Sequence, residues 1–139
     1  MSLDDNGEDI KEGLRFALAK APLVIVTGGL GPTENDVTRE AISEFTGIKL
    51  HEHPDTIAAL AARFKLPPGQ LRHNIRRQGQ VPEHGAYLKN SVGTAVGLVF
   101  EFGGRVIVAV PGPPRELRPM VEDELVPYLA RRFGTRPAA

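Results

Sequence analysis

The chain has 139 residues and a balanced charge, with 17 Lys and Arg against 17 Asp and Glu. This balance argues against a broad basic surface for nucleic acid. The absence of cysteine excludes disulfides, thiolate metal sites and a cysteine nucleophile. The sequence shows no signal peptide and no apolar run near about 18 residues, so we expect a cytoplasmic chain that does not enter a membrane. The length favours one domain over residues 1–139, with flexible ends at 1–7 and 134–139.

The first elements predicted along the chain are a helix and a buried strand. Apolar residues at helical spacing predict a helix over residues 8–20, which would cover one face of a sheet, and Ala21-Pro22 ends it. Residues 23–26 are a continuous β-rich apolar run. Such a run is typical of a central parallel strand that is covered on both faces.

A glycine loop and a second helix follow this strand. Glycines allow backbone angles closed to other residues and let a ligand approach the main chain, and the loop contains Gly28, Gly29 and Gly31. Thr33 or Asp36 is placed to cap a helix whose apolar residues share one face. The free N–H groups and the dipole at such a junction favour an anion, and a phosphate is the natural ligand.

The loop differs from two common nucleotide-binding loops. Pro32, Thr33 and Glu34 stand where an ATP P-loop continues to its lysine, and Glu34 occupies the position of the third glycine of a dinucleotide-binding loop. The loop carries two acids instead, Glu34 and Asp36. A carboxylate beside a phosphate is favourable when a divalent cation bridges them. Helix capping is the alternative role for Asp36.

The middle of the chain predicts helices and no strong site. His51 and His53 would share one face of a strand, but surface positions are favoured over a metal site because no third ligand lies near in sequence. Helices are expected over residues 55–64 and 70–78, with Pro67-Pro68-Gly69 between them. The second helix is rich in arginine without interleaved aromatic residues, which favours a solvated face over nucleic-acid binding.

The last third predicts a β-hairpin and a second strand–loop–helix junction. Alternating apolar residues predict a strand over 96–102, and a β-rich run predicts a second strand over 105–110. Gly103-Gly104 joins them as a hairpin, which makes the sheet mixed. The second strand runs into residues 111–114, which are Pro-Gly-Pro-Pro, and a helix follows with Pro119 inside its pattern. If both junctions open at the same sheet edge, they form two walls of one crevice. A stiff turn is the alternative.

Four motifs stand in order along the chain: TGGLGPTENDVTRE at 27–40, QVPEHGA at 80–86, NSVGTAVG at 90–97 and VPGPPRELRPM at 110–120. Together they resemble the molybdopterin-binding (MoCF biosynthesis) domain family, most closely the competence/damage-inducible protein A (CinA) group. The resemblance implies an α/β three-layer domain with a mixed, mostly parallel sheet and one β-hairpin. Family domains ordinarily begin with a strand, helix and strand that this sequence lacks. We therefore expect an N-terminally truncated domain whose exposed sheet edge favours a homo-oligomer.

The resemblance also implies a small phosphorylated ligand. Its CinA-like motif favours hydrolysis of a nucleotide pyrophosphate of the ADP-ribose class with Mg²⁺ or Co²⁺; the alternative is a molybdopterin- or nucleotide-binding module without catalysis. Asp36 is the candidate catalytic residue and metal ligand, holding an ion that polarises the phosphate and lowers the pKa of an attacking water. The other candidate ligand contacts are Thr27, Gly28, Gly29, Gly31, Thr33, Thr38, Asn90, Gly93, Thr94, Pro111, Gly112, Arg115 and Glu116. For Asn90, Gly93 and Thr94, simple turn chemistry is the alternative.

Overall fold

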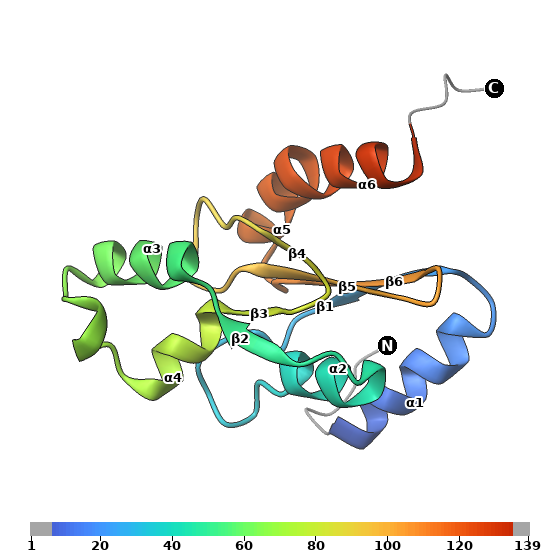
Figure 1. The fold of residues 1–139 in the computed structure, drawn as a ribbon, viewed down its shortest axis with the longest axis horizontal. Helices are drawn as coiled ribbons and strands as arrows, with labels where there is room; N and C mark the ends of the chain where they lie inside the picture. The colour runs from blue at the N-terminus through green and yellow to red at the C-terminus, as the bar shows by residue number, and fades with distance from the viewer. Residues whose placement is uncertain (1–6, 135–139) are drawn as a thin grey trace.

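A four-stranded sheet lies at the centre of residues 7–134, which are the residues that the computed structural model describes (Figure 1). Its strands, in spatial order, are β1 (Leu23–Thr27), β6 (Arg105–Val110), β5 (Gly97–Phe102) and β4 (Gly85–Leu88). β1 and β6 pair in parallel, whereas β5 is antiparallel to both β6 and β4. A separate antiparallel pair is formed by β2 (Leu50–Glu52) and β3 (Gln80–Pro82).

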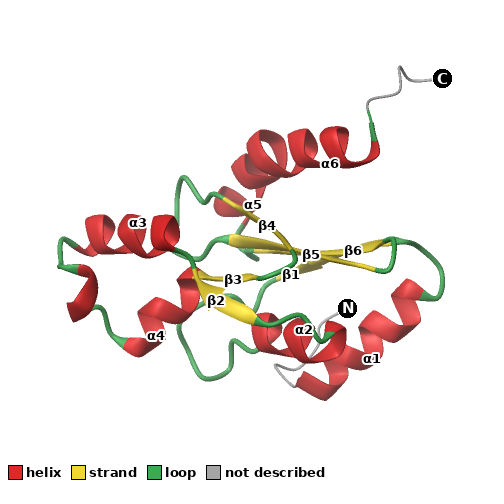
Figure 2. Cartoon of the chain, in the orientation of Figure 1, coloured by secondary structure: helices red, strands yellow, loops and turns green. Residues whose placement is uncertain are grey.

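Helices cover both faces of this sheet, which gives three layers (Figures 1 and 2). One face packs against α1 (Gly7–Leu18) and α2 (Thr38–Thr46). The other packs against α5 (Pro114–Met120), the π-helical turn η3 (Val121–Leu125) and α6 (Val126–Phe133). A further group of helices projects at one end of the sheet and comprises α3 (Pro54–Phe64), η1 (Pro68–Gln70), α4 (His73–Arg76) and η2 (Arg77–Gly79).

The two inner strands of the described sheet are β6 and β5, and β6 shows how both faces are covered. Ile107 and Ala109 face the layer of α1 and α2, while Val106 and Val108 face α5 and η3, and all four are fully buried. Successive strand residues point to opposite faces, so a run of apolar residues is what a strand covered on both sides requires. The core therefore consists of two apolar layers on either side of β5 and β6.

The prediction that residues 23–26 form a central strand is wrong for the described chain. β1 lies at one end of the four-stranded order, with β6 as its neighbour. Ile25 consequently leaves 47% of its surface exposed. The apolar run of β1 resembles that of a fully buried strand. Composition indicates which faces of a strand are apolar, but it does not indicate whether a second strand forms hydrogen bonds with it.

The expected α/β layers, mixed sheet and β-hairpin are confirmed. Gly103 and Gly104 connect β5 to β6 with φ angles of +52° and +76°. A two-residue hairpin turn with both central residues at positive φ matches the twist of the flanking strands, and glycine adopts these angles without strain. The antiparallel share of the sheet is larger than expected, because β4 extends the hairpin by a further antiparallel pairing.

Several local predictions differ from the structure. Residues 70–78 form short helical turns instead of one helix, and the short strands β3 and β4, which were not predicted, follow them. Neither Thr33 nor Asp36 caps α2, whose N-cap is Val37 without a side-chain hydrogen bond. Pro119 and Pro127 each lack a backbone donor, and η3 forms between them instead of a regular α-helical turn.

The predictions for the two ends of the chain fall almost entirely outside the described residues. Gly7 and Gly134 are the exceptions, since Gly7 begins α1 and Gly134 is the C-cap of α6. Within residues 7–134, no helix combines the length and apolarity needed to cross a membrane.

Candidate functional site

Two loops meet at the carboxyl ends of the parallel strands β1 and β6. The first is the site loop, residues 28–37, and the second follows β6 at residues 111–113. Gly28 N donates a hydrogen bond to Val110 O at 2.9 Å, which continues the parallel pairing into the loops. A Cβ built on Gly112 would lie 3.5 Å from Gly28 Cα. The parallel register of β1 and β6 thus brings the two strand–loop–helix junctions into contact.

These loops line a cavity of about 190 Å³, which we call the loop cavity. Its lining includes Asp36, the predicted catalytic residue. It also includes six glycines, prolines and acids that were predicted as ligand contacts: Gly28, Gly29, Gly31, Pro111, Gly112 and Glu116. Thr94 also lines it. The expected crevice between the two junctions is therefore present, although whether these residues bind a ligand stays a prediction.

The Asp36 carboxylate faces back into the site loop and not toward the end of α2. Its Oδ2 accepts hydrogen bonds from Thr33 N at 3.0 Å and Thr33 Oγ1 at 2.7 Å. Its Oδ1 has no hydrogen-bond partner among the described residues. Thr33 therefore orients one of the two carboxylate oxygens of Asp36, a residue that lines the loop cavity.

Two glycines are required by how closely side chains pack on the site loop. A Cβ on Gly29 would lie 2.0 Å from Thr38 Oγ1, and a Cβ on Gly31 would lie 2.8 Å from Asp36 Oδ2. Gly28 differs, because its φ is +89° and a Cβ there would meet nothing within 4 Å. Gly29 and Gly31 therefore allow the close packing of the loop, whereas the side of Gly28 where a Cβ would stand has no protein atom packed against it.

A buried arginine supports the site loop from behind. Arg39 is fully buried in the first turn of α2, and its Nη2 donates to Leu30 O at 3.0 Å. Its Nε and Nη1 have no hydrogen-bond partner among the described residues. Burial lowers the pKa of Arg39 to about 10, an effect that the nearby Glu40 partly offsets. The side chain therefore remains a cation at neutral pH.

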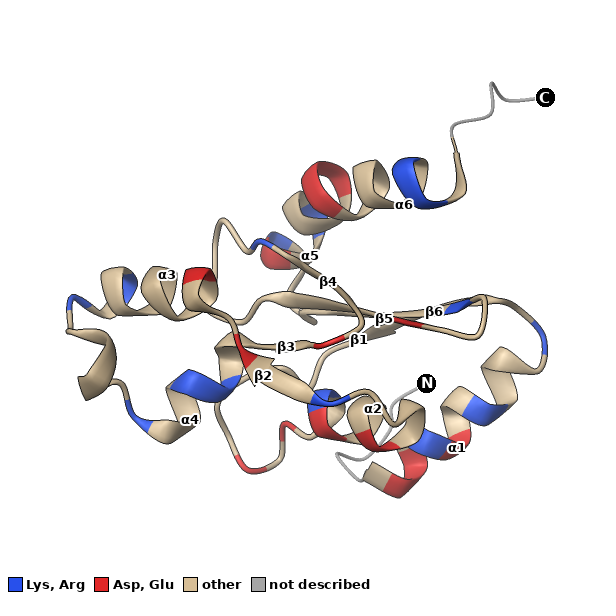
Figure 3. Ribbon diagram, in the orientation of Figure 1, with Lys and Arg blue, Asp and Glu red and all other residues tan. Residues whose placement is uncertain are grey.

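A second arginine fastens the outer side of the site loop. Arg77, at the start of η2, donates to Asp36 O at 2.8 Å and pairs with Glu40 at 3.1 Å. A longer contact of 3.4 Å reaches Thr33 O. Figure 3 shows the resulting arrangement, with acidic segments in the site loop facing basic segments of α4 and η2. Carbonyl groups of the loop are thus held from two directions by arginines.

The turn over residues 90–94 supports the second wall. Asn90 Nδ2 donates to Glu116 Oε1 and to Ala95 O, both at 2.9 Å. Its Oδ1 accepts from the backbone N–H groups of Val92 and Gly93. The Asn90 amide is therefore occupied by contacts within the protein, and it positions Glu116 at the loop cavity.

Gln78 is a site residue that the sequence did not reveal. It is 1% exposed, lines the loop cavity and accepts a hydrogen bond from Thr94 Oγ1 at 2.6 Å. Its Nε2 has no hydrogen-bond partner among the described residues. Nothing in the arginine-rich stretch around it distinguishes this glutamine from a surface residue, because its burial depends on contacts with residues distant in sequence.

Some predicted residues lie elsewhere. Thr27 and Thr38 line a different groove of about 330 Å³ beside β1 and α1, which also reaches Gly28 and Gly29. Thr33 does not line the loop cavity, but its hydroxyl donates a hydrogen bond to Asp36, which does. Arg115 does not line the loop cavity either. The structure therefore separates the predicted contacts into residues that line the cavity and residues that do not.

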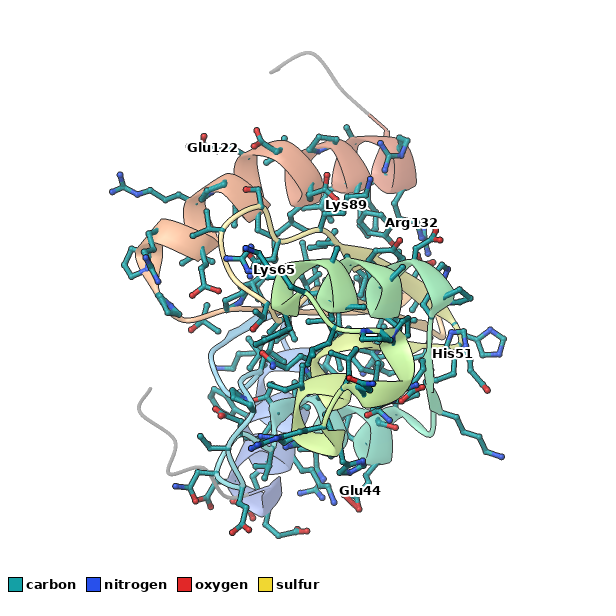
Figure 4. All side chains as sticks on the ribbon, turned by 90° about the vertical axis from the view of Figure 1, so that its left-hand side faces the viewer. Glu44, His51, Lys65, Lys89, Glu122 and Arg132 are labelled. Carbon is teal, nitrogen blue, oxygen red and sulfur yellow. The ribbon has the colours of Figure 1, made fainter. Side chains whose placement is uncertain are left out.

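Neither His51 nor His53 lines the loop cavity. His53 Nδ1 accepts from Asp55 N at 3.0 Å and caps α3, while His51 points away from the fold in Figure 4. No group of three or more His, Asp or Glu side chains is placed to hold a metal ion within the described part of the chain. The carboxylates of the loop cavity are Asp36 and Glu116.

Comparisons with known proteins agree on one family. The sequence model described as "Probable molybdopterin binding domain" matches residues 1–131. A "Putative competence-damage inducible protein" of Symbiobacterium thermophilum is 44% identical over 134 residues, which are 96% of this chain and 32% of the relative. A "CinA-like protein" of Dictyoglomus turgidum is 36% identical over 93% of this chain and 31% of the relative. The chain thus spans about a third of the length of these relatives.

Solved structures agree with this grouping. A crystal structure of the protein CinA from Thermoplasma acidophilum has a TM-score of 0.80 and 28% identity, covering 88% of this chain and 72% of that one. The molybdopterin biosynthesis enzyme MoaB of Thermus thermophilus, at TM-score 0.52 and 21% identity over 96% and 71% of the two chains, supports the fold alone. The chain therefore belongs to the molybdopterin-binding (MoCF biosynthesis) domain family and resembles its CinA-like, competence-damage inducible members.

Proposed function

We propose that this chain binds a small phosphorylated ligand, of the molybdopterin or nucleotide class, with the phosphate in the loop cavity. The observation that carries this proposal is the contact of two glycine-containing loops at the ends of the parallel strands β1 and β6. Ligands of open α/β sheets bind at such strand ends, and backbone N–H groups there favour anions. The open backbone at Gly28 and the buried cation Arg39 behind the loop both support an anionic ligand.

A second candidate function is hydrolysis of a nucleotide pyrophosphate of the ADP-ribose class. The observation that favours it is the pair of carboxylates, Asp36 and Glu116, at the same cavity. Mg²⁺ is commonly held by one or two carboxylates together with substrate phosphates, so these residues fit a Mg²⁺ or Co²⁺ ion. When bound, such an ion would neutralise charge on the phosphates. The site loop would orient the phosphate, and the Asn90 amide would hold Glu116 in place.

Asp36→Asn tests this second candidate. Hydrolysis adds water across the pyrophosphate bond of ADP-ribose and gives AMP and ribose 5-phosphate, which ³¹P NMR distinguishes. With Mg²⁺ or Co²⁺ present, we expect turnover by the wild type and a loss of at least about 100-fold in the variant, because the ion loses an anionic ligand beside the reacting phosphate. The amide oxygen still accepts the Thr33 hydrogen bonds, so the fold should persist.

Glu34→Gln is the matched control, since it neutralises an exposed acid of the same loop that does not line the cavity. It should leave turnover unchanged. Near-normal turnover by Asp36→Asn would remove Asp36 from the mechanism. Ligand binding without turnover by the wild type would leave the chain as a binding module.

We also propose that the exposed edge of β1 supports a homo-oligomer. Ile25 is 47% exposed on a β-rich strand whose described pairing is with β6 alone. Apolar edge strands are templates for pairing with another chain. We expect the wild type to elute as a dimer in size-exclusion chromatography with light scattering, and Ile25→Lys to shift it to monomer. A wild-type monomer at high micromolar concentration would contradict this proposal.

A further inference from the structure

A larger cavity, of about 550 Å³, lies between α3 and the segment over residues 87–96; we call it the α3 cavity. One wall is formed by one face of α3, including Ala59, Leu60 and Arg63. The other wall includes Tyr87 and Val96. Its volume is within the range of about 300–1,000 Å³ that is usual for small-molecule sites. No role described above accounts for this cavity.

The lining of the α3 cavity combines an apolar surface with polar groups at its edge. Leu60 is buried, and the Tyr87 ring packs against His53 at 5.1 Å between ring centroids. Burial raises the pKa of the Tyr87 hydroxyl above its ordinary value. Asp55 and Lys89 also line the cavity and are exposed, and Lys89 lies between α3 and the C-terminal helices in Figure 4.

One side of the cavity is fastened to the other by Arg63. Its Nη2 donates a hydrogen bond to Val92 O, across from α3 to the turn over residues 90–94. This contact fixes a planar guanidinium at the opening of the cavity. Guanidinium groups and phenol rings both stack on planar ligands, whereas the carboxylate and ammonium groups nearby can pair with ring N–H groups and ring nitrogens.

The α3 cavity and the loop cavity adjoin each other. Thr94 lines both. Gly93 lines the α3 cavity, and a Cβ built on it would lie 1.9 Å from Glu116 Oε1, which belongs to the loop cavity. Gln78, which lines the loop cavity, accepts the hydrogen bond of the shared residue Thr94. The two cavities therefore share Thr94 as a lining residue and lie next to each other at Gly93 and Glu116.

We propose that the α3 cavity binds the planar, purine- or pterin-type heterocycle of the ligand whose phosphate lies in the loop cavity. The inference rests on the proposed phosphate site and adds the part of the ligand that decides specificity. The apolar surface of Leu60 and Tyr87 takes the ring face, and the polar groups at the edge read its nitrogen and oxygen atoms. A phosphorylated sugar without a base would fill the loop cavity alone and bind more weakly.

The test fills the α3 cavity without touching the loop cavity. Ala59 is an exposed helical residue that lines the α3 cavity, so Ala59→Phe places a ring inside it. Ala58 is the exposed neighbour on the same helix and does not line it, which makes Ala58→Phe the matched control. Binding of ADP-ribose and of ribose 5-phosphate is measured for each protein by isothermal titration calorimetry, with thermal unfolding as a check of the fold.

The expected result separates the two ligands. Ala59→Phe should weaken ADP-ribose binding by at least about tenfold, the scale at which a hydrophobic pocket senses added bulk, and leave ribose 5-phosphate binding unchanged. Ala58→Phe should change neither. Equal binding of the two ligands by the wild type, or an Ala59→Phe variant that binds ADP-ribose normally, would overturn the inference and leave the phosphate site intact. Failure of the wild type to bind either ligand would overturn the proposed function itself.

Discussion

Gly29→Ala is expected to lower the free energy of unfolding by about 3 kcal/mol and to abolish ligand binding at the loop cavity. The new Cβ would lie 2.0 Å from Thr38 Oγ1 and 2.9 Å from Thr38 Cβ, so the site loop or α2 must move. The φ angle of +74° at Gly29 adds backbone strain for any residue with a side chain. Urea denaturation measures the stability loss, and calorimetry with ADP-ribose measures the loss of binding.

Gly28→Ala separates strain from collision. Gly28 has a similar φ of +89°, but a Cβ there meets no protein atom within 4 Å. We expect it to cost only about 1 kcal/mol, the backbone term alone. If ligand affinity still falls, the added methyl group occupies space that the ligand uses. Equal stability losses for the two variants would show that Thr38 yields easily, and would remove close packing as the reason for Gly29.

Arg39→Met is expected to weaken binding of a phosphorylated ligand by about tenfold while changing the free energy of unfolding by no more than about 1 kcal/mol. The substitution removes the buried charge and the hydrogen bond that holds Leu30 O. Two guanidinium nitrogens lack partners among the described residues, so burying the cation is costly, and an unbranched apolar side chain relieves that cost. Stability and function should therefore respond very differently.

Arg39→Lys distinguishes the contribution of charge from that of loop support. Lysine keeps the positive charge behind the site loop but has a single ammonium group in place of the guanidinium. Affinity that follows charge would survive in Arg39→Lys and fall in Arg39→Met. Wild-type affinity for ADP-ribose in Arg39→Met would show that the buried cation has no part in binding. Both variants are compared by calorimetry at low and moderate salt.

Local sequence patterns predicted several of the strands and turns in their correct order along the chain. The apolar run of β1, the alternating residues of β5 and the Gly103-Gly104 turn all predicted elements that the structure contains. Short strands were missed, because β2 and β3 have three residues each and no alternation long enough to detect. The turn chemistry of residues 80–94 also concealed β4, whose pairing with β5 is a contact between segments and not a local preference.

The candidate site divides in the same way. Its glycines and Asp36 were predicted from their spacing after a strand, and the structure places them at one cavity with Glu116. Arg39 and Gln78 gave no sequence signal, since an arginine in a polar helix turn and a glutamine among arginines normally face solvent. Both are buried here because the site loop and the turn over residues 90–94 fold over them.

The amino-acid sequence by itself determined the class of fold, the glycine loop after β1 and the family. The fold class and the loop depend on local patterns of apolar residues and glycines, and the family depends on four short motifs and their order along the chain. Only the tertiary structure decided that β1 lies at an edge of the described sheet, that the loops after β1 and β6 share one cavity, and that a second cavity adjoins it under α3. These features arise from strand pairing and from the packing of segments far apart in sequence. Local propensities do not predict strand pairing or the packing of distant segments, because the same residues can form a strand or a turn beside different neighbours.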